Sequence, residues 1–186
     1  MAARVSAATL HDIAKTAVVP AYDRSGLKAG IIHFGVGNFH RAHQAVYLDD
    51  LFNLGEGQDF ALVGAGVRAA DEDMRQKLLA QDLLTTVVEQ EADHSSARVT
   101  GSMIGYIKPG ETEEIISALA DPAIRIASLT ITEGGYFINS ATGKFDPQHP
   151  DIVADAASPA SPKTVFGLLL AGLARRRKTG IVPFTV

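Results

Sequence analysis

The chain has no cysteine among its 186 residues. Disulfide bonds, thiolate nucleophiles and cysteine-ligated zinc sites are therefore excluded. It also has no apolar stretch as long as a membrane-spanning helix, and residues 1–29 lack the basic start and continuous apolar core of a secretory signal. From these absences we expect a cytoplasmic protein without a membrane partner.

Positive charge is not in excess either, since 17 Lys and Arg stand against 21 Asp and Glu and the net charge is −4. Nucleic-acid binding is disfavoured because no overall basic field can displace the counterions of a phosphate backbone. Apolar residues make up 46% of the chain and charged residues 20%, which is the balance of a folded globular domain. The length suits one domain with a core and would be cramped for two.

Apolar segments alternate with segments of helical periodicity along most of the chain. The expected strands are residues 31–34, 60–67, 83–89, 97–107, 124–131 and 181–186. One expected helix directly follows the first strand. The others cover residues 71–81, 112–120 and 162–178. Residues 136–145 carry turn signals and are expected to form a loop or hairpin. We interpret residues 1–29 as an arm with a short helix from Thr9 to Ala17, and residues 30–186 as one α/β domain with a doubly wound, mostly parallel sheet.

The first expected strand, residues 31–34, leads through Gly35 and Gly37 into a helical pattern. A strand that enters a helix through Gly-x-Gly is the phosphate-binding unit of dinucleotide folds, because the glycines allow a sharp turn and a close approach of backbone to a pyrophosphate. The third glycine of the usual pattern is replaced by His40. On spacing alone, a tight turn without a ligand remains an equal alternative.

The eleven residues from Gly35 to Ala45 read Gly-Val-Gly-Asn-Phe-His-Arg-Ala-His-Gln-Ala. This run closely resembles the N-terminal signature of the polyol-specific long-chain dehydrogenases, the family typified by mannitol 2-dehydrogenase. Residues 64–71 and 130–136 resemble two further segments of that family, and the resemblance extends over about residues 22–186. It implies a Rossmann-type domain that binds NAD.

The resemblance assigns the turn and the start of the following helix to the cofactor. The residues that it implies are Gly35, Val36, Gly37, Asn38, Phe39, His40 and Arg41. Among these, Arg41 is also suited to donate a charge-assisted hydrogen bond to a phosphate.

Asp71 follows the second expected strand, where dinucleotide-binding folds place the carboxylate that accepts hydrogen bonds from the ribose hydroxyls. It lies well beyond the usual distance of roughly 20 residues from the glycines, and a longer first helix and a loop would have to absorb the difference. A carboxylate here could equally stabilise a helix N-terminus. The resemblance implies that Asp71 favours NAD over NADP, whereas Arg68 nearby could attract a 2′-phosphate.

Residues 130–136, Thr-Ile-Thr-Glu-Gly-Gly-Tyr, lie at the carboxyl end of an expected strand, the edge at which α/β sheets bind ligands. From position alone, Glu133 is either a site carboxylate or a solvated turn residue. The resemblance implies that this segment lines the nicotinamide and substrate cleft. It thereby gives Glu133 an auxiliary catalytic role in passing protons and places Thr132 against the cofactor.

Three histidines, His33, His40 and His43, raise the question of a metal site, because His40 and His43 are three residues apart on one expected helix. No third ligand is suggested by the sequence, and the family that the chain resembles works without a metal. We therefore predict no metal site.

Two basic features have simpler explanations than ligand binding. Lys163 lies in a segment that also resembles the family, but Pro162 behind a Ser161 cap is typical of helix initiation. The basic run at residues 175–178 suits the C-terminus of a helix, where the helix dipole favours cations.

For the intact protein the resemblance implies NAD-dependent oxidation of a sugar alcohol to a ketose, as from mannitol to fructose. Family members are longer and carry their Lys base and its Asn and His partners in an α-helical C-terminal domain. No residue here corresponds to these groups, so we expect a domain truncated near Val186 and inactive alone. The alternatives are a hexuronate (fructuronate or tagaturonate) reductase of the same family, a non-catalytic dinucleotide-binding module and a methyltransferase.

Overall fold

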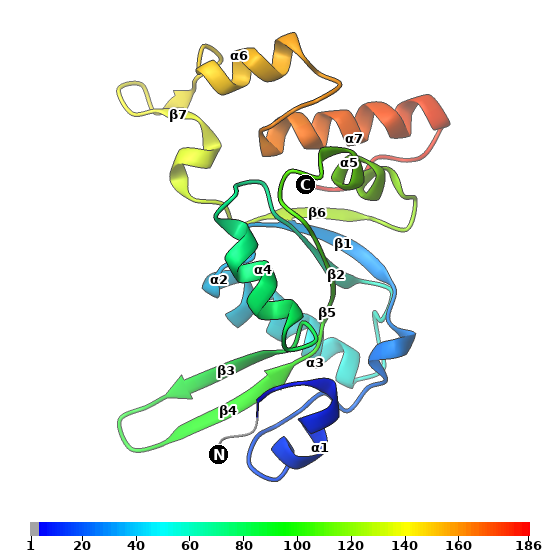
Figure 1. Cartoon of the computed structure of the whole chain (residues 1–186), viewed down its shortest axis with the longest axis vertical. Coiled ribbons are helices and arrows are strands. Elements are labelled where there is room, and N and C mark those ends of the chain that lie inside the picture. The colour runs from blue at the N-terminus through cyan, green and yellow to red at the C-terminus, as the bar shows by residue number, and fades with distance from the viewer. Residues whose placement is uncertain (1–3) are drawn as a thin grey trace.

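The computed structural model describes residues 4–186, apart from the side chain of Glu133. Its centre is a four-stranded parallel sheet with the strand order β5-β2-β1-β6 (Figure 1). The strands are β1 (Ala29–Phe34), β2 (Ala61–Ala65), β5 (Met103–Ile107) and β6 (Ile126–Leu129). The chain runs from β1 outward to β5 and then returns to place β6 beside the other edge of β1. The carboxyl ends of β1 and β6 therefore form a topological switch point, the place at which such sheets bind ligands.

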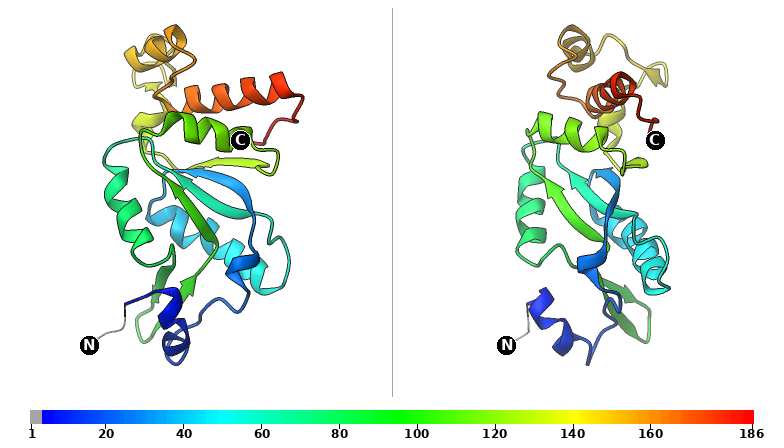
Figure 2. Two further views of the ribbon diagram at one scale, coloured as in Figure 1. Left: turned by 45° about the vertical axis from the view of Figure 1, so that its right-hand side comes forward. Right: turned by 90° about the vertical axis from the view of Figure 1, so that its right-hand side faces the viewer.

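Helices cover both faces of the sheet. One face carries α3 (Gln44–Asn53) and α4 (Asp71–Leu79), and the other carries α5 (Thr112–Ala120) and α7 (Val165–Thr179) (Figure 2). Neighbouring residues of β1 supply the two cores, because Ile31 packs with the first pair of helices and Ile32 with the second. Burial on both faces explains the continuous apolar strands and confirms the doubly wound fold.

The helix behind the glycine turn is divided into α2 (Asn38–Ala42) and α3. His43 lies at the break, with φ −124° and ψ −83°. Its Nδ1 is hydrogen-bonded to the Phe39 carbonyl oxygen at 2.8 Å. In a continuous helix, this oxygen would accept the backbone N–H of His43. That N–H bonds to His40 instead, so the side chain competes with the helix and interrupts it.

One strand prediction was wrong in its extent, and another expected strand pairs outside the parallel sheet. The third expected strand, β3 (Thr85–Gln90), lies outside the parallel sheet and forms an antiparallel hairpin with β4 (Ser95–Thr100). The segment 97–107 is not one strand, because Gly101 and Ser102 separate β4 from β5. The Gly101 N–H donates to Asp49 Oδ1 at 2.9 Å, and the Ser102 hydroxyl donates to the Ala45 carbonyl at 2.8 Å. These bonds turn the chain toward α3 and out of the hairpin.

The N-terminal arm has less helix than expected. It forms the short helices η1 (Ala7–Thr9), α1 (Leu10–Ile13) and η2 (Arg24–Gly26). Val18 lies beside β4, where it exchanges backbone hydrogen bonds with Ala97 and Val99. The arm is therefore attached to the hairpin.

The segment after β6 contains η3 (Glu133–Tyr136), a hairpin of β7 (Ile138–Asn139) and β8 (Lys144–Phe145), and α6 (Pro150–Ala157). A loop or hairpin was expected here, and α6 was not. Helix α7 begins at Val165 rather than at Pro162, and its cap is Thr164, whose hydroxyl oxygen accepts from the Gly167 N–H at 3.0 Å. The buried carboxylate of Asp155 accepts the Thr164 hydroxyl at 2.7 Å and so selects this cap over Ser161.

The basic run at the end of α7 contains one buried member. Arg176 is 1% exposed, and its guanidinium donates to the carbonyls of Leu119, Asp121, Ile124 and Val182. The cation therefore caps the C-terminus of α5 rather than that of its own helix, which differs from the prediction. The last residues form less structure than the expected strand, with one parallel bridge from Thr185 to Ile126. Within residues 4–186, none of the helices is long and apolar enough to cross a membrane.

Candidate cofactor site

A cavity of about 620 Å³ lies at the switch point of the sheet. Its walls come from the glycine turn after β1, the loop after β2, the segment after β6 and the start of α7. Sites for small organic ligands commonly have this size and this place in an α/β sheet.

The two glycines of the turn serve different purposes. Gly35 has φ +87°, and a Cβ atom there would lie 2.5 Å from the carbonyl oxygen of Thr130. The protein itself therefore requires glycine at this position. Gly37 has an ordinary φ of −94°, and a Cβ there would meet only the Gly35 oxygen at 3.8 Å. Nothing in the described chain fills the space beside Gly37, so that space is open to a ligand.

The structure places only part of the predicted cofactor loop at the cavity. Gly35, Val36 and Gly37 line it, whereas the other four predicted residues are not among its described lining residues: Asn38, Phe39, His40 and Arg41. Phe39 is 65% exposed and stacks on His43. Arg41 donates to the Val36 carbonyl at 2.9 Å and to Asn38 Oδ1 at 2.6 Å. Arg41 thus stabilises the glycine turn through these hydrogen bonds and does not line the cavity.

His40 lies buried beneath the turn and stacks on His33, with ring centroids 3.6 Å apart. Burial and the neighbouring His33 lower the pKa of His40 to about 3, and burial lowers the pKa of His33 to about 4. Both rings are therefore neutral near pH 7. His40 Nδ1 lies 3.1 Å from Gln44 Oε1, and its Nε2 has no hydrogen-bond partner among the described residues.

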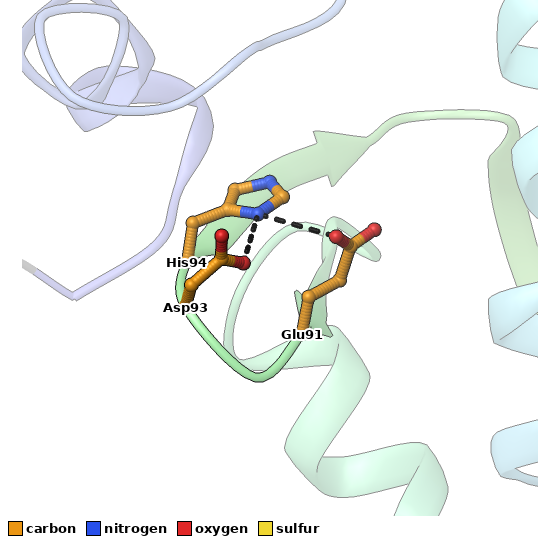
Figure 3. Close-up of side chains that lie close together, drawn as sticks. All are labelled: Glu91, Asp93 and His94. Atoms are coloured by element: carbon orange, nitrogen blue, oxygen red, sulfur yellow. Dashed lines mark ion pairs between the residues drawn. The ribbon is translucent and has the colours of Figure 1, made fainter.

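Possible metal ligands gather elsewhere, at the tip of the β3–β4 hairpin. His94 Nδ1 lies 3.4 Å from a Glu91 oxygen and 3.7 Å from an Asp93 oxygen, and all three side chains are exposed (Figure 3). Exposed ion pairs of this kind need no metal to explain them. The cluster therefore carries no argument for a metal site.

Asp71 begins α4 and lines the cavity together with Arg68. Its Oδ2 accepts the N–H groups of Val67 at 2.9 Å and Arg68 at 3.0 Å, and Arg68 Nη2 lies 3.8 Å from its Oδ1. The carboxylate therefore closes the loop before α4 and also lines the cavity. Its role toward the ribose stays a prediction. The α2–α3 pair and the loop before β2 account for its distance from the glycines.

The segment after β6 forms the opposite wall. Thr132, Gly134 and Gly135 line the cavity, and the Thr130 hydroxyl donates to the Gly35 carbonyl at 2.7 Å. The Glu133 side chain lies outside the described part of the structure, so its predicted role stays a prediction.

The lining also includes residues that were not assigned to the site from the sequence, among them Tyr106, His149, Asp151 and Lys163. Burial raises the pKa of Tyr106 to about 12, so its phenol stays protonated. His149 is the N-cap of α6, and Pro150 occupies the first helical position. Proline at the first helical position is typical of a helix start and is the sequence signal that indicates α6. The Asp155 carboxylate accepts the Lys163 N–H at 2.8 Å and fixes the backbone at that residue.

Residues 29–186 match the family model of the mannitol dehydrogenase Rossmann domain. The mannitol 2-dehydrogenase of Cereibacter sphaeroides is 59% identical over 169 residues, which cover 90% of this chain and 35% of that protein. The mannitol 2-dehydrogenase of Pyricularia oryzae is 45% identical over 193 residues, which cover all of this chain and 38% of that protein. The chain thus spans somewhat more than a third of the length of these relatives.

Two solved structures have the same fold. The Pseudomonas fluorescens mannitol 2-dehydrogenase, in a ternary complex with NAD and D-mannitol, has a TM-score of 0.92 and 45% identity, covering 98% of this chain and 37% of that one. A substrate-free D-sorbitol dehydrogenase has a TM-score of 0.89 and 39% identity, covering 98% of this chain and 38% of that one. By sequence and by fold, the chain belongs to the mannitol dehydrogenase family, whose Rossmann domain it contains.

Proposed function

We propose that this chain is the NAD-binding domain of a polyol 2-dehydrogenase, with residues 30–186 as the binding domain and residues 1–29 as its arm. The observation that carries the proposal is the open space beside Gly37 at the switch point of a parallel sheet. A relative with 45% identity and a TM-score of 0.92 is a ternary complex with NAD and D-mannitol, which supports the same cofactor here.

In this proposal each wall of the cavity meets one part of the dinucleotide. The backbone at Gly35–Gly37 receives the pyrophosphate, for which amide groups and missing side chains are suited. Asp71 accepts hydrogen bonds from the adenosine ribose, and Thr132 contacts the nicotinamide half. Glu133 assists proton transfer. Asn38, Phe39, His40 and Arg41 shape the loop from outside the cavity rather than contact the cofactor.

The proposed reaction is oxidation of a sugar alcohol to a ketose, of the mannitol-to-fructose type. The bound dinucleotide supplies the hydride acceptor, and the chain orients it. A base must also remove the hydroxyl proton of the alcohol, and we place that base in the part of the longer relatives that this chain does not span. The D-sorbitol dehydrogenase at 39% identity favours a second polyol as the alternative substrate.

Replacing Gly37 by valine is expected to weaken NADH binding by at least about tenfold, since a side chain there would take the space of the pyrophosphate and a loss of about 1.4 kcal/mol suffices for that factor. Calorimetric titration of the purified chain and the variant with NADH and NADPH measures the effect. The variant should unfold at the same denaturant concentration as the parent, because its side chain points into open space. A folded parent chain that binds no NADH would contradict the proposal.

Asp71→Asn is expected to lower the preference for NADH over NADPH by about tenfold, because removal of the negative charge relieves repulsion of a 2′-phosphate in a partly buried place. The amide oxygen can still accept the Val67 and Arg68 N–H groups, so the loop should persist. Asp73→Asn, an exposed position in the first turn of the same helix, is the matched control and should leave the ratio of dissociation constants unchanged. If the ratio of dissociation constants were the same in both variants, Asp71 would not contact the ribose.

A further inference from the structure

A buried polar cluster lies directly beneath the glycine turn, and the proposed function does not use it. His33 of β1 is 0% exposed; its Nδ1 lies 2.8 Å from Ser128 Oγ on the neighbouring β6, and its Nε2 lies 3.0 Å from Thr130 Oγ1. The register pairs His33 with Ser128. Burying an imidazole costs free energy that its hydrogen bonds only offset, whereas an apolar side chain would fill a strand without that cost. Stability alone therefore does not explain why a histidine occupies this strand position.

The proton positions in this cluster follow from its acceptors. The Gly35 carbonyl can only accept, so Thr130, 2.7 Å away, gives it its single hydroxyl proton. Thr130 Oγ1 can then only accept from His33, which requires the proton of the neutral ring to be on Nε2. The same Nε2 lies 3.3 Å from the Gly35 oxygen, where a lone pair would be repelled. Nδ1 is left as an acceptor for the Ser128 hydroxyl, whose oxygen lies 2.8 Å from Nδ1 and 3.1 Å from Gln44 Oε1. Ser128 has a single proton, and we assign it to the shorter contact.

These contacts determine the direction of one peptide group. The Gly35 oxygen receives the Thr130 hydroxyl, approaches the His33 N–H and accepts the Gly37 N–H at 2.7 Å. In a trans peptide the N–H points opposite to the carbonyl. With the Gly35 oxygen held toward the cluster, the N–H of Val36 points away from it. Val36 itself lines the cavity.

We propose that His33 is a positioning residue for the cofactor: acting with Thr130, it holds the Gly35 carbonyl toward the buried cluster and thereby directs the Val36 N–H at the bound pyrophosphate. This inference rests on the proposed NAD site. Thr130 also begins the segment that forms the nicotinamide wall, so one cluster ties the pyrophosphate wall to the nicotinamide wall. His40 covers one face of the His33 ring at 3.6 Å and holds it in place.

A matched pair of variants tests the proposal in the 186-residue chain. Thr130→Val keeps the shape of the side chain and removes its hydroxyl, whereas Thr130→Ser keeps the hydroxyl. We expect Thr130→Val to weaken the binding of NADH and of ADP-ribose by about tenfold. This is the scale of one lost hydrogen bond and a misdirected amide. Thr130→Ser should stay within about twofold. Adenosine, which has no pyrophosphate, should bind all three proteins equally in ligand-detected NMR.

His33 itself is tested by a second pair. His33→Leu removes both ring nitrogens and should resemble Thr130→Val, whereas His33→Gln retains an N–H donor and should recover part of the NADH affinity. If the role of the cluster were purely structural, every variant would bind adenosine as well as NADH more weakly, and that result would overturn the proposal. Equal NADH affinities for Thr130→Val and Thr130→Ser would overturn it as well. A parent chain that binds no NADH would instead refute the proposed NAD site.

The proton assignment has a test that needs neither a variant nor a ligand. ¹⁵N NMR of the labelled chain at pH 7 should show His33 as a neutral ring with its proton on Nε2. His40, whose Nδ1 faces the Gln44 oxygen, should show the opposite tautomer. A His33 ring protonated on Nδ1 would leave Thr130 Oγ1 without a donor and would overturn the arrangement.

Discussion

Replacing Gly35 by alanine is expected to lower the free energy of unfolding by about 3 kcal/mol, because two penalties add at this position. The first is the left-handed conformation, since φ is +87° and any side chain is strained there. The second is steric. The new methyl group would lie 2.5 Å from the Thr130 oxygen and 2.8 Å from its carbonyl carbon. Both atoms belong to the backbone directly after β6 and cannot move aside as a flexible side chain would.

Denaturant unfolding of Gly35→Ala beside Gly37→Ala measures this difference. Gly37 has φ −94° and free space around its missing Cβ, so its alanine variant should lie within about 0.5 kcal/mol of the parent. Together the pair separates a glycine required by the fold from a glycine required by a ligand. Equal stability of Gly35→Ala and the parent would mean that the turn has another conformation in solution.

Arg176→Met is expected to lower the free energy of unfolding by about 3 kcal/mol or more, since buried acceptors that lose their donor each cost about 1–3 kcal/mol. The guanidinium donates hydrogen bonds to the carbonyls of Leu119 and Val182 at 2.7 and 2.6 Å. It also donates to the carbonyls of Asp121 and Ile124. Methionine can occupy the volume but offers no donors. The end of α5, the start of β6 and the last segment would lose their common partner.

The exposed neighbour Arg177 gives the control for this prediction. Arg177→Met removes the same charge from the same helix at an exposed position, and its effect should stay within about 0.5 kcal/mol. Calorimetric or denaturant unfolding of both variants measures the difference. Similar losses in the two variants would indicate that charge at the end of α7, rather than the buried contacts, determines the effect.

Cofactor affinity and fold stability are expected to respond separately around this site. Gly37 faces open space, so its substitution should act on binding alone. Gly35 touches Thr130 backbone, so its substitution should act on the fold first. The distinction matters for any binding experiment, because only variants that leave unfolding unchanged report on the cavity itself.

The sequence alone determined the fold class and the location of the site. Parallel strands buried on both faces are nearly continuous apolar runs, which made β1, β2 and the strand at β6 recognisable from composition. The glycine turn is a local feature, because two glycines between a strand and a helix restrict a few neighbouring dihedral angles. The family resemblance of residues 35–45 rests likewise on contiguous residue types. All of these signals lie within short stretches of chain.

Only the tertiary structure decided which residues meet. Local periodicity does not reveal the partner of a strand, and so the sequence predicted a strand at residues 83–89 but not its antiparallel pairing with β4. Arg176 had the sequence pattern of a solvated helix end, but its burial depends on α5 and on Val182, which lie on either side of it in the chain. His40 stands next to the turn in sequence and beneath it in space. These outcomes depend on contacts between residues far apart along the chain, which no local pattern encodes.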